Sequence, residues 1–282
     1  MDTETIEEQR RANYEIAEAV ALGWERRRAS IEELSAPARA WMVRELAPCS
    51  GEVVLELAAG VGDTGFEAAE IIGEAGRLIS TDFSPAMLSA ARRRGAELGV
   101  QNVDYREIDA ERIDLDDDSV DAVLCRFAYM LMPDPGKALA ETRRVLRPGG
   151  RLALAVWGAM EENPFFTIVA ISLVQQGHLP PPEPPVPPVF SMASPERTQD
   201  LLERAGFSEV RTEEVPVRAE LPDAQEYLSL IQDTAGPIGL ALQGLSESDR
   251  EVVGADVEDS LRRFAAEEGY VLPGSALCAV AA

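Results

Sequence analysis

Apolar and polar positions follow two alternating periods through the middle of the chain. Short apolar runs predict buried strands, and between them apolar residues recur at helical spacing. The strand candidates are VVLEL (53–57), RLIST (77–81), VDYREI (103–108), SVDAVLC (119–125) and RLALAVW (151–157). The helix candidates are FEAAEIIG (66–73), AMLSAARRRGAELG (86–99) and DPGKALAETRRVL (134–146), followed by an RPGG turn. This alternation predicts a Rossmann-like α/β fold with a doubly wound, mostly parallel, seven-stranded sheet.

The flanking segments are predicted to be mainly helical. Residues 1 to about 47 carry apolar positions at helical intervals, and Pro37 favours a helix start. After residue 157 the pattern predicts a helix, which a proline-rich run at 180–188 follows. A core helix and an edge strand are predicted next, then a helical stretch from Asp223 to Glu268 and a last strand, ALCAVAA. The expected organisation is an N-terminal helical cap (1–48), a nucleoside-binding core (49–157), a helical, proline-rich lid insertion (158–193), a core helix and edge strand (194–217), a helical insertion (218–270) and a final strand (271–282).

Composition excludes several classes of partner. The formal net charge is −24, so phosphate backbones and anionic lipids are repelled. No apolar run approaches the length of a membrane span, and the acidic N-terminus is unlike a secretory signal. We therefore expect a cytoplasmic protein without nucleic acid or membrane insertion, and a homodimer is left open. The three scattered cysteines predict neither a disulfide framework nor a metal site.

The segment EVVLELAAGVGDTG (52–65) carries the most specific chemistry. Gly60, Gly62 and Gly65 form a G-x-G-x-x-G loop between a strand and a helix, which nicotinamide- and flavin-binding proteins also use. In those proteins the helix N-terminus faces a pyrophosphate. Glu56 would oppose such an anion and suits a cationic ligand instead. S-adenosylmethionine carries a sulfonium and an α-ammonium and has no phosphate.

Several motifs in order resemble the class I S-adenosylmethionine-dependent methyltransferases, in the branch related to ubiquinone/menaquinone C-methyltransferases and small-molecule methyltransferases. ELAAGVGDTG is similar to the first motif, with Ala58 where the first glycine is usual. TDFSPAML is similar to the second motif, IDAERIDLDDDSVDAVLCR to the third and fourth, and LRPGGRLALAVW to the turn into the fifth strand. The resemblance covers residues 52–157 and implies S-adenosylmethionine as cofactor and S-adenosylhomocysteine as product.

The resemblance assigns the adenosine half of the ligand to residues after the second and third strands. Asp82 is expected to accept hydrogen bonds from both ribose hydroxyls, the alternative being a helix N-cap. Phe83 and Met87 would pack against the adenine, although core packing explains Met87 equally well. Asp109 would meet the adenine amino group beside the Ala110 backbone, and a solvated loop acid is the alternative.

The methionine half is assigned to the first and fourth strands. Glu56 would support a water or backbone network, while Gly60 and Gly62 allow close approach of the turn. Cys125 and Arg126 would lie beneath the methionine tail. Arg126 would pair either with the ligand carboxylate or with an interior acid, and the sequence does not decide between the two.

The methyl acceptor is assigned to the segments outside the core. His178, the only histidine, is a candidate general base on a lid loop, or an ordinary loop histidine. The candidate wall residues, each also suited to helix packing, are Tyr14, Trp24, Tyr129, Met130, Asn163, Phe165 and Phe166. Their character favours methylation at oxygen or carbon of an apolar small molecule such as a quinone precursor or secondary metabolite. An oxidoreductase and a non-catalytic S-adenosylmethionine-binding module remain alternatives. The proline run is expected to be a stiff loop across the pocket mouth, or else a ligand for a partner's aromatic groove.

Overall fold

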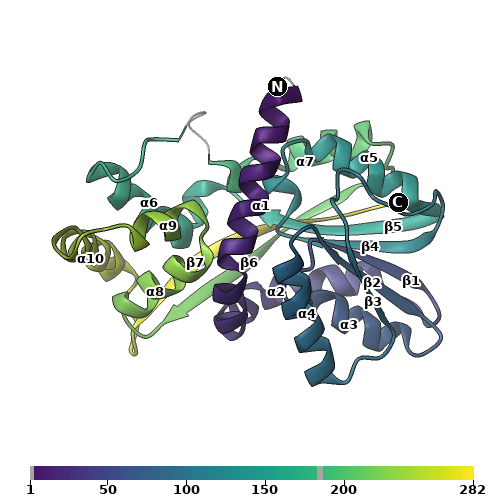
Figure 1. Cartoon of the computed structure of the whole chain (residues 1–282), viewed down its shortest axis with the longest axis horizontal. Coiled ribbons are helices and arrows are strands. Elements are labelled where there is room, and N and C mark those ends of the chain that lie inside the picture. Colours follow the sequence, from purple (N-terminus) through teal and green to yellow (C-terminus); the bar gives the residue numbers. More distant parts are fainter. Residues whose placement is uncertain (1–2, 183–186) are drawn as a thin grey trace.

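Seven strands form one sheet in the order β3-β2-β1-β4-β5-β7-β6 (Figure 1). The structure, a computed structural model, describes residues 3–182 and 187–282. The strands are β1 (Val53–Leu57), β2 (Arg77–Asp82), β3 (Val103–Glu107), β4 (Val120–Arg126), β5 (Leu146–Trp157), β6 (Arg211–Leu221) and β7 (Tyr270–Ala281). Strands β1 to β5 pair in parallel, and β7 runs antiparallel between β5 and the edge strand β6. The predicted doubly wound, mostly parallel sheet is confirmed.

Helices cover both faces of the sheet. They are α1 (Thr3–Arg26), α2 (Arg28–Leu46), α3 (Asp63–Ile72), α4 (Pro85–Leu98), α5 (Pro135–Val145), α6 (Pro164–Gln175), α7 (Pro195–Arg204), α8 (Ala224–Thr234), α9 (Pro237–Gln243) and α10 (Glu247–Leu261). Helices α2, α3 and α4 lie on one face, and α5 and α7 lie on the other (Figure 1). Among the described helices, none combines the length and apolar character needed to cross a membrane.

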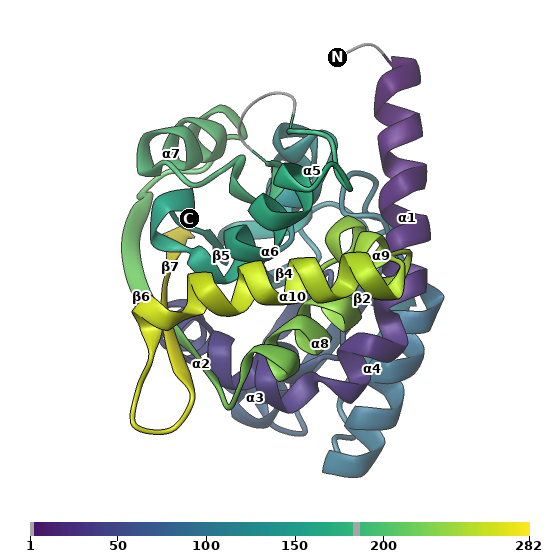
Figure 2. The same ribbon diagram turned by 90° about the vertical axis from the view of Figure 1, so that its left-hand side faces the viewer.

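Two apolar cores hold the molecule together. The larger core fills the space on both faces of the central strands and includes fully buried Leu55, Leu57 and Leu124. The smaller core lies under α6, α8, α9 and α10 and includes buried Tyr227 and Leu272. Figure 2 shows α10 crossing in front of this helical part, with α1 and α4 side by side at its flank. The insertions predicted after the fifth strand therefore have a core of their own.

Two expectations from the sequence were wrong. Pro37 does not start a helix, because α2 begins at Arg28 and runs through it. The proline costs one backbone hydrogen bond, while Trp41 and Met42 on the same helix are buried against the sheet. The RPGG segment does not precede the fifth strand as expected, since β5 starts at Leu146; it forms a bulge within the strand, because Val120 pairs with Leu146 and Ala122 with Arg151, and residues 147–150 have no partner on β4.

Asn163 connects the start of α6 to the antiparallel strand β7. Its side chain is 1% exposed, and its Oδ1 accepts a hydrogen bond from the Ser275 backbone N–H at 3.1 Å. Its Nδ2 donates to the backbone carbonyls of Ser275, at 3.1 Å, and Ala159, at 2.9 Å. The expectation that Asn163 walls an acceptor pocket is replaced by this structural role, because each side-chain polar atom is used to satisfy buried backbone.

We expect Asn163→Ala to lower the free energy of unfolding by roughly 2–4 kcal/mol, because it leaves both Ser275 backbone groups without their side-chain partner. Urea denaturation followed by far-ultraviolet circular dichroism measures the change. Gln101, an exposed amide that bonds only a local carbonyl, supplies the control; Gln101→Ala should change stability by less than about 0.5 kcal/mol. Equal effects of the two substitutions would contradict the role of Asn163.

Candidate functional site

The candidate site lies where the order of strands in the sheet reverses direction. The chain proceeds outward from β1 through β2 to β3, then returns to place β4 on the other side of β1. Such a switch point leaves a crevice at the carboxyl ends of the strands, where ligands of α/β proteins bind. The loop after β1 crosses this point and leads into α3, which begins at Asp63.

Glu56 is a buried carboxylate that ties β1 to the first turn of α3. It is 3% exposed, and its Oε1 accepts a hydrogen bond from the Gly65 N–H at 2.7 Å. Its Oε2 accepts a second one from the Ser80 hydroxyl at 3.2 Å. A Cβ atom at position 65 would overlap the Glu56 carboxylate, so this contact requires glycine. Burial raises the pKa of Glu56 to about 8, and a nearby cation would favour its ionised form.

The loop itself uses left-handed backbone at three positions. Gly60 and Gly62 have φ of 56° and 90°, and Ala58 has φ of 50°. A Cβ at Gly62 would overlap the Phe66 ring, whereas the space around Gly60 is open. Ala58 therefore keeps the conformation for which glycine is suited, at the energetic cost that a Cβ brings to left-handed backbone.

Asp82 at the end of β2 holds the opposite side of the loop. Its Oδ2 accepts a hydrogen bond from the Gly60 N–H at 3.0 Å, and its Oδ1 accepts one from the Ser84 N–H at 2.9 Å. Burial raises its pKa to about 6. The N-cap of α4 is Ser84, whose hydroxyl accepts from the Met87 N–H. The Phe83 backbone N–H is a third donor to the Asp82 carboxylate, which leaves about one lone-pair site for a ligand hydroxyl.

A cleft of about 370 Å³ opens beside Phe83, at the carboxyl ends of β2 and β3. Phe83, Glu107 and Asp109 line it from the sheet side, and Glu7, Arg10, Arg11 and Tyr14 line it from α1. The Tyr14 ring meets the Phe83 ring edge-on, with centroids 5.9 Å apart. We expected Tyr14 in the wall of the acceptor pocket, but it lies beside Phe83, one of the residues expected around adenine.

Asp109 and its neighbours form the floor of this cleft. One Asp109 oxygen, Oδ1, accepts a hydrogen bond from the Glu111 N–H at 2.9 Å, and Oδ2 lies 3.1 Å from Arg10 Nε. The side chain is about 30% exposed, so it is neither a fully solvated loop acid nor fully covered. Ala110 is buried beside it, and Met87 is buried at 6% exposure.

Arg126 pairs with an interior acid. Its Nη2 lies 2.6 Å from Glu32 Oε1, and its Nη1 donates to the Ser35 hydroxyl, both on α2. Of the two pairings that the sequence left open, the structure therefore shows the one with an interior acid. Cys125 is fully buried, and this burial raises the pKa of its thiol. Its sulfur is therefore packed in the core.

Three expected wall residues belong to helix packing. Tyr129 is fully buried, with its hydroxyl 2.7 Å from the Thr142 hydroxyl, and Met130 is 3% exposed. Trp24 donates from Nε1 to the Thr234 carbonyl at 3.1 Å and so ties α1 to α8. Their burial and their partners assign them to structural contacts, because apolar character alone did not separate core from pocket.

The two phenylalanines on α6 differ. Phe165 is buried at 6% exposure in the smaller core, against Tyr227. Phe166 is half-buried, 4.6 Å from the Trp157 ring and 6.1 Å from the Phe190 ring, measured between centroids. Only Phe166 therefore extends toward the carboxyl end of β5.

His178 lies with the helical insertion. Its Nε2 is 3.9 Å from Asp249 Oδ1, at the start of α10. Helix α10 lies at the opposite end of the molecule from α3 and α4, which flank the glycine loop (Figure 1). The expectation that His178 is a base over the acceptor is therefore corrected. The proline run that follows falls partly outside the described residues.

Phe127 is a candidate site residue that the sequence did not indicate. It follows Arg126 at the end of β4 with φ of 56°, a conformation that is rare for a bulky side chain. Its N–H donates to the Ala155 carbonyl at 2.7 Å, and its ring stacks on Trp157 at 4.0 Å with the planes 8° apart. The only signal in the sequence was its place directly after a strand that ends at the site.

Glu56 should make stability fall as pH rises. Its native pKa of about 8 exceeds its usual value of 4.5, so its contribution is fully present below about pH 4.5 and is lost as pH passes about 8. We expect the unfolding free energy of Glu56→Gln, relative to the wild type, to rise between pH 5 and pH 8.5 in urea titrations. Glu74→Gln, at an exposed position, should keep the wild-type profile. Parallel profiles for Glu56→Gln and wild type would refute the assignment.

Ala58→Gly should stabilise the protein by up to about 1 kcal/mol, because it removes left-handed strain of about 1–2 kcal/mol and adds a smaller entropy cost. Chemical denaturation measures the change. Ala59→Gly is the matched control; Ala59 is buried and lacks a positive φ, so glycine there should destabilise by at least about 0.5–1 kcal/mol. Changes of the same sign at both positions would be inconsistent with strain at Ala58.

Sequence comparison supports a methyltransferase domain. Residues 54–150 match the family model described as a methyltransferase domain. A demethylmenaquinone methyltransferase from Clavibacter sepedonicus is 36% identical over 140 residues, which cover 50% of this chain and 51% of that protein. An arsenite methyltransferase from Halobacterium salinarum is 32% identical over 109 residues, covering 39% and 28%. The chain thus spans about half or less of the length of these curated relatives.

Solved structures share the fold. A S-adenosylmethionine-dependent methyltransferase from Aquifex aeolicus is similar with a TM-score of 0.51 and 25% identity, covering 65% of this chain and 87% of that chain. A putative methyltransferase from Bacillus halodurans C-125 gives a TM-score of 0.57 at 19% identity, covering 86% and 97%. With the ordered motifs and the strand order, these findings show that residues 54–150 form a methyltransferase domain, in a chain whose fold is that of S-adenosylmethionine-dependent methyltransferases and which is similar to a demethylmenaquinone methyltransferase.

Proposed function

We propose that the protein transfers a methyl group from S-adenosylmethionine to oxygen or carbon of an apolar small molecule. The observation that carries this proposal is the pair of buried carboxylates, Glu56 and Asp82, that hold the glycine loop from its two sides. Burial raises the pKa of both carboxyls, and a bound cation would favour their ionised forms whereas a bound anion would oppose them, so a cationic ligand suits this loop better than a pyrophosphate does.

The site fits an adenosine ligand on the described residues. The cleft of about 370 Å³ is lined by two aromatic side chains, Tyr14 from α1 and Phe83 from the sheet side, and by the Asp109 carboxylate. A carboxylate accepts hydrogen bonds from an exocyclic amino group, and Asp82 offers an acceptor for a ribose hydroxyl. The rings can pack against a base, which is typical of nucleoside sites.

The residues around the loop would act by positioning. When bound, S-adenosylmethionine would supply an electrophilic methyl group: a bond from the acceptor atom to the methyl carbon would form as the carbon–sulfur bond breaks, S-adenosylhomocysteine would leave, and the acceptor's proton would pass to water. Asp82 and Asp109 would fix the adenosine, so that the reacting carbon stays at one place beside the β4 end. Alignment of this kind can provide effective molarities of roughly 10⁵–10⁸ M. We assign no general base, because His178 contacts the helical insertion.

A row of aromatic rings supports an apolar acceptor. Phe127, Trp157, Phe166 and Phe190 come from the end of β4, the end of β5, α6 and the segment before α7, and successive ring centroids lie 4.0 to 6.1 Å apart. Phe127 holds a strained conformation at the strand end next to the proposed cofactor site, and such strain is concentrated at functional positions. Trp157 and Phe190 are buried in the larger core, so an acceptor would contact the half-buried Phe127 and Phe166, where a planar, weakly polar ring suits better than a charged peptide.

Isothermal titration calorimetry tests cofactor binding. We expect S-adenosylmethionine and S-adenosylhomocysteine to bind, and Asp82→Ala to weaken both by at least about tenfold, since the ribose loses a charge-assisted hydrogen bond. Asp114→Ala, at an exposed turn, should bind as the wild type does. Binding of NADH with no binding of either nucleoside at millimolar concentration would favour an oxidoreductase and refute the proposal.

A non-catalytic binding module is the remaining alternative, and one structural neighbour shows that this fold is not confined to methyl transfer. The [4+2]-cyclase SpnF has a similar fold, with a TM-score of 0.54 at 18% identity, so fold alone does not specify the reaction. Mass spectrometry of a panel of quinols, phenols and aliphatic alcohols, each incubated with the protein and S-adenosylmethionine, separates the two. A product heavier by one methylene unit supports transfer, and nucleoside binding without any product across the panel would support the module.

A further inference from the structure

The N-terminal half of α1 supplies one entire side of the adenosine cleft. Glu7, Arg10, Arg11 and Tyr14 line the cleft from this helix, and their spacing puts them on one helical face. Of the remaining three lining residues, Glu107 ends β3, and Phe83 and Asp109 follow β2 and β3. Figure 1 shows α1 standing across the molecule between the sheet and the helical insertion, so this wall comes from a segment distant in sequence from the glycine loop.

The two halves of α1 are attached in different ways. Its C-terminal half contains the buried residues Ala21 and Gly23, and the Gly23 Cα packs directly on the Asp233 backbone of α8. Arg27, just after the helix, adds an ion pair to Asp233 at 2.7 Å. Before Ala21, every described side chain of α1 is at least partly exposed. The C-terminal half is therefore anchored by packing, whereas the N-terminal half relies on polar contacts.

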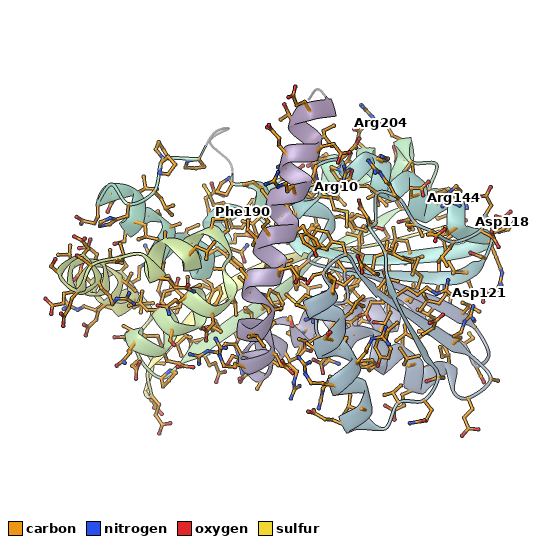
Figure 3. The ribbon with its side chains drawn as sticks, viewed as in Figure 1. Arg10, Asp118, Asp121, Arg144, Phe190 and Arg204 are labelled. Carbon is orange, nitrogen blue, oxygen red and sulfur yellow. The ribbon has the colours of Figure 1, made fainter. Side chains whose placement is uncertain are left out.

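Arg10 is the centre of those polar contacts. Its side chain is 15% exposed; Nε lies 3.1 Å from Asp109 Oδ2, and Nη2 donates to Glu111, which is 2% exposed. Glu111 in turn accepts the Asp134 N–H at 3.1 Å. Figure 3 labels Arg10 on the half of α1 nearest the N-terminus. Its guanidinium thus joins the helix to the carboxylate expected to meet adenine and to a buried acid beside it.

Glu18 attaches α1 by hydrogen bonds to the start of α4, on the side of the cleft where we expect the ribose. Its Oε1 accepts a hydrogen bond from the Ser84 hydroxyl at 2.6 Å and another from the Ala86 N–H at 3.1 Å. These groups begin α4, two to four residues beyond Asp82. Helix α1 therefore touches both ends of the adenosine half of the site, with Arg10 at the base and Glu18 at the ribose.

We propose that the N-terminal half of α1 is a movable wall of the nucleoside site, which Arg10 fastens across Asp109 and Glu111. This inference rests on the proposed function, because it takes the cleft to hold adenosine. With the wall closed, Tyr14 and Phe83, whose rings contact each other edge-on, would pack together against the base, and the Arg10 ion pairs would close the exit. Nucleoside release requires these pairs to separate, which leaves the buried Glu111 carboxylate without its cation and so opposes opening.

Dissociation of S-adenosylhomocysteine, followed in a stopped-flow chase with excess unlabelled nucleoside, tests the wall. We expect Arg10→Gln to speed dissociation at least about tenfold and to change association less, because loss of one partner of a buried charge pair acts mainly on the dissociation rate. Arg204→Gln is the matched control; Arg204 is an exposed arginine of α7 paired only within its helix, so its rate should equal that of the wild type. An unchanged dissociation rate in folded Arg10→Gln would overturn the proposal.

Two further measurements keep the test decisive if Arg10→Gln is poorly folded. Tyr14→Ala keeps the ion pairs and should raise the dissociation constant about tenfold by removing an aromatic contact with the base. In the wild type, S-adenosylhomocysteine should slow amide hydrogen exchange over residues 5–16 more than over residues 19–26. Binding without either effect would refute the wall and leave the proposed function intact, whereas absence of nucleoside binding by the wild type would refute the proposed function itself.

Discussion

The buried carboxylate of Glu56 is the constraint on which the candidate site depends. It joins three parts of the fold, since β1 carries it, α3 donates to it from Gly65, and β2 donates to it from Ser80. Only glycine fits at position 65, because a Cβ atom there would overlap the Glu56 carboxylate. Because burial raises the Glu56 pKa to about 8, a cation bound nearby and the ionised carboxylate stabilise each other. Loop geometry and ligand charge are thus linked through one side chain.

The outer part of the site is built by charge rather than by apolar packing. The chain carries 50 acidic and 26 basic residues, and several arginines connect segments distant in sequence. Arg10 connects α1 to the loop after β3, Arg126 connects β4 to α2, and Arg27 connects the α1–α2 junction to α8. Exposed pairs of this kind contribute little to stability, whereas partly buried pairs fix relative positions. The inner loop is held by hydrogen bonds to the buried carboxylates of Glu56 and Asp82, whereas the proposed wall over the cleft is attached by ion pairs that can separate.

The parts that the sequence predicted well are those set by local rules. Strand and helix alternation, the glycine turn and the proline start of α4 depend on neighbouring residues, so the sheet and the placement of Asp82 at a strand end followed directly. The failures all depend on tertiary packing. Tyr14 and Tyr129 have similar chemistry, yet one lines a cleft and the other is fully buried. Pro37 lies inside a helix, and the backbone strain of Phe127 has no sequence signature.

Calorimetry of S-adenosylmethionine binding in two buffers of different ionisation enthalpy, at pH 7.5, tests the link between Glu56 and ligand charge most directly. If a bound cation favours the ionised carboxylate, the wild type should release more protons on binding than Glu56→Gln does, because its Glu56 pKa falls from about 8. Subtracting the variant removes the contribution of the ligand's own amino group. Tight binding with equal proton release by both proteins would contradict the account.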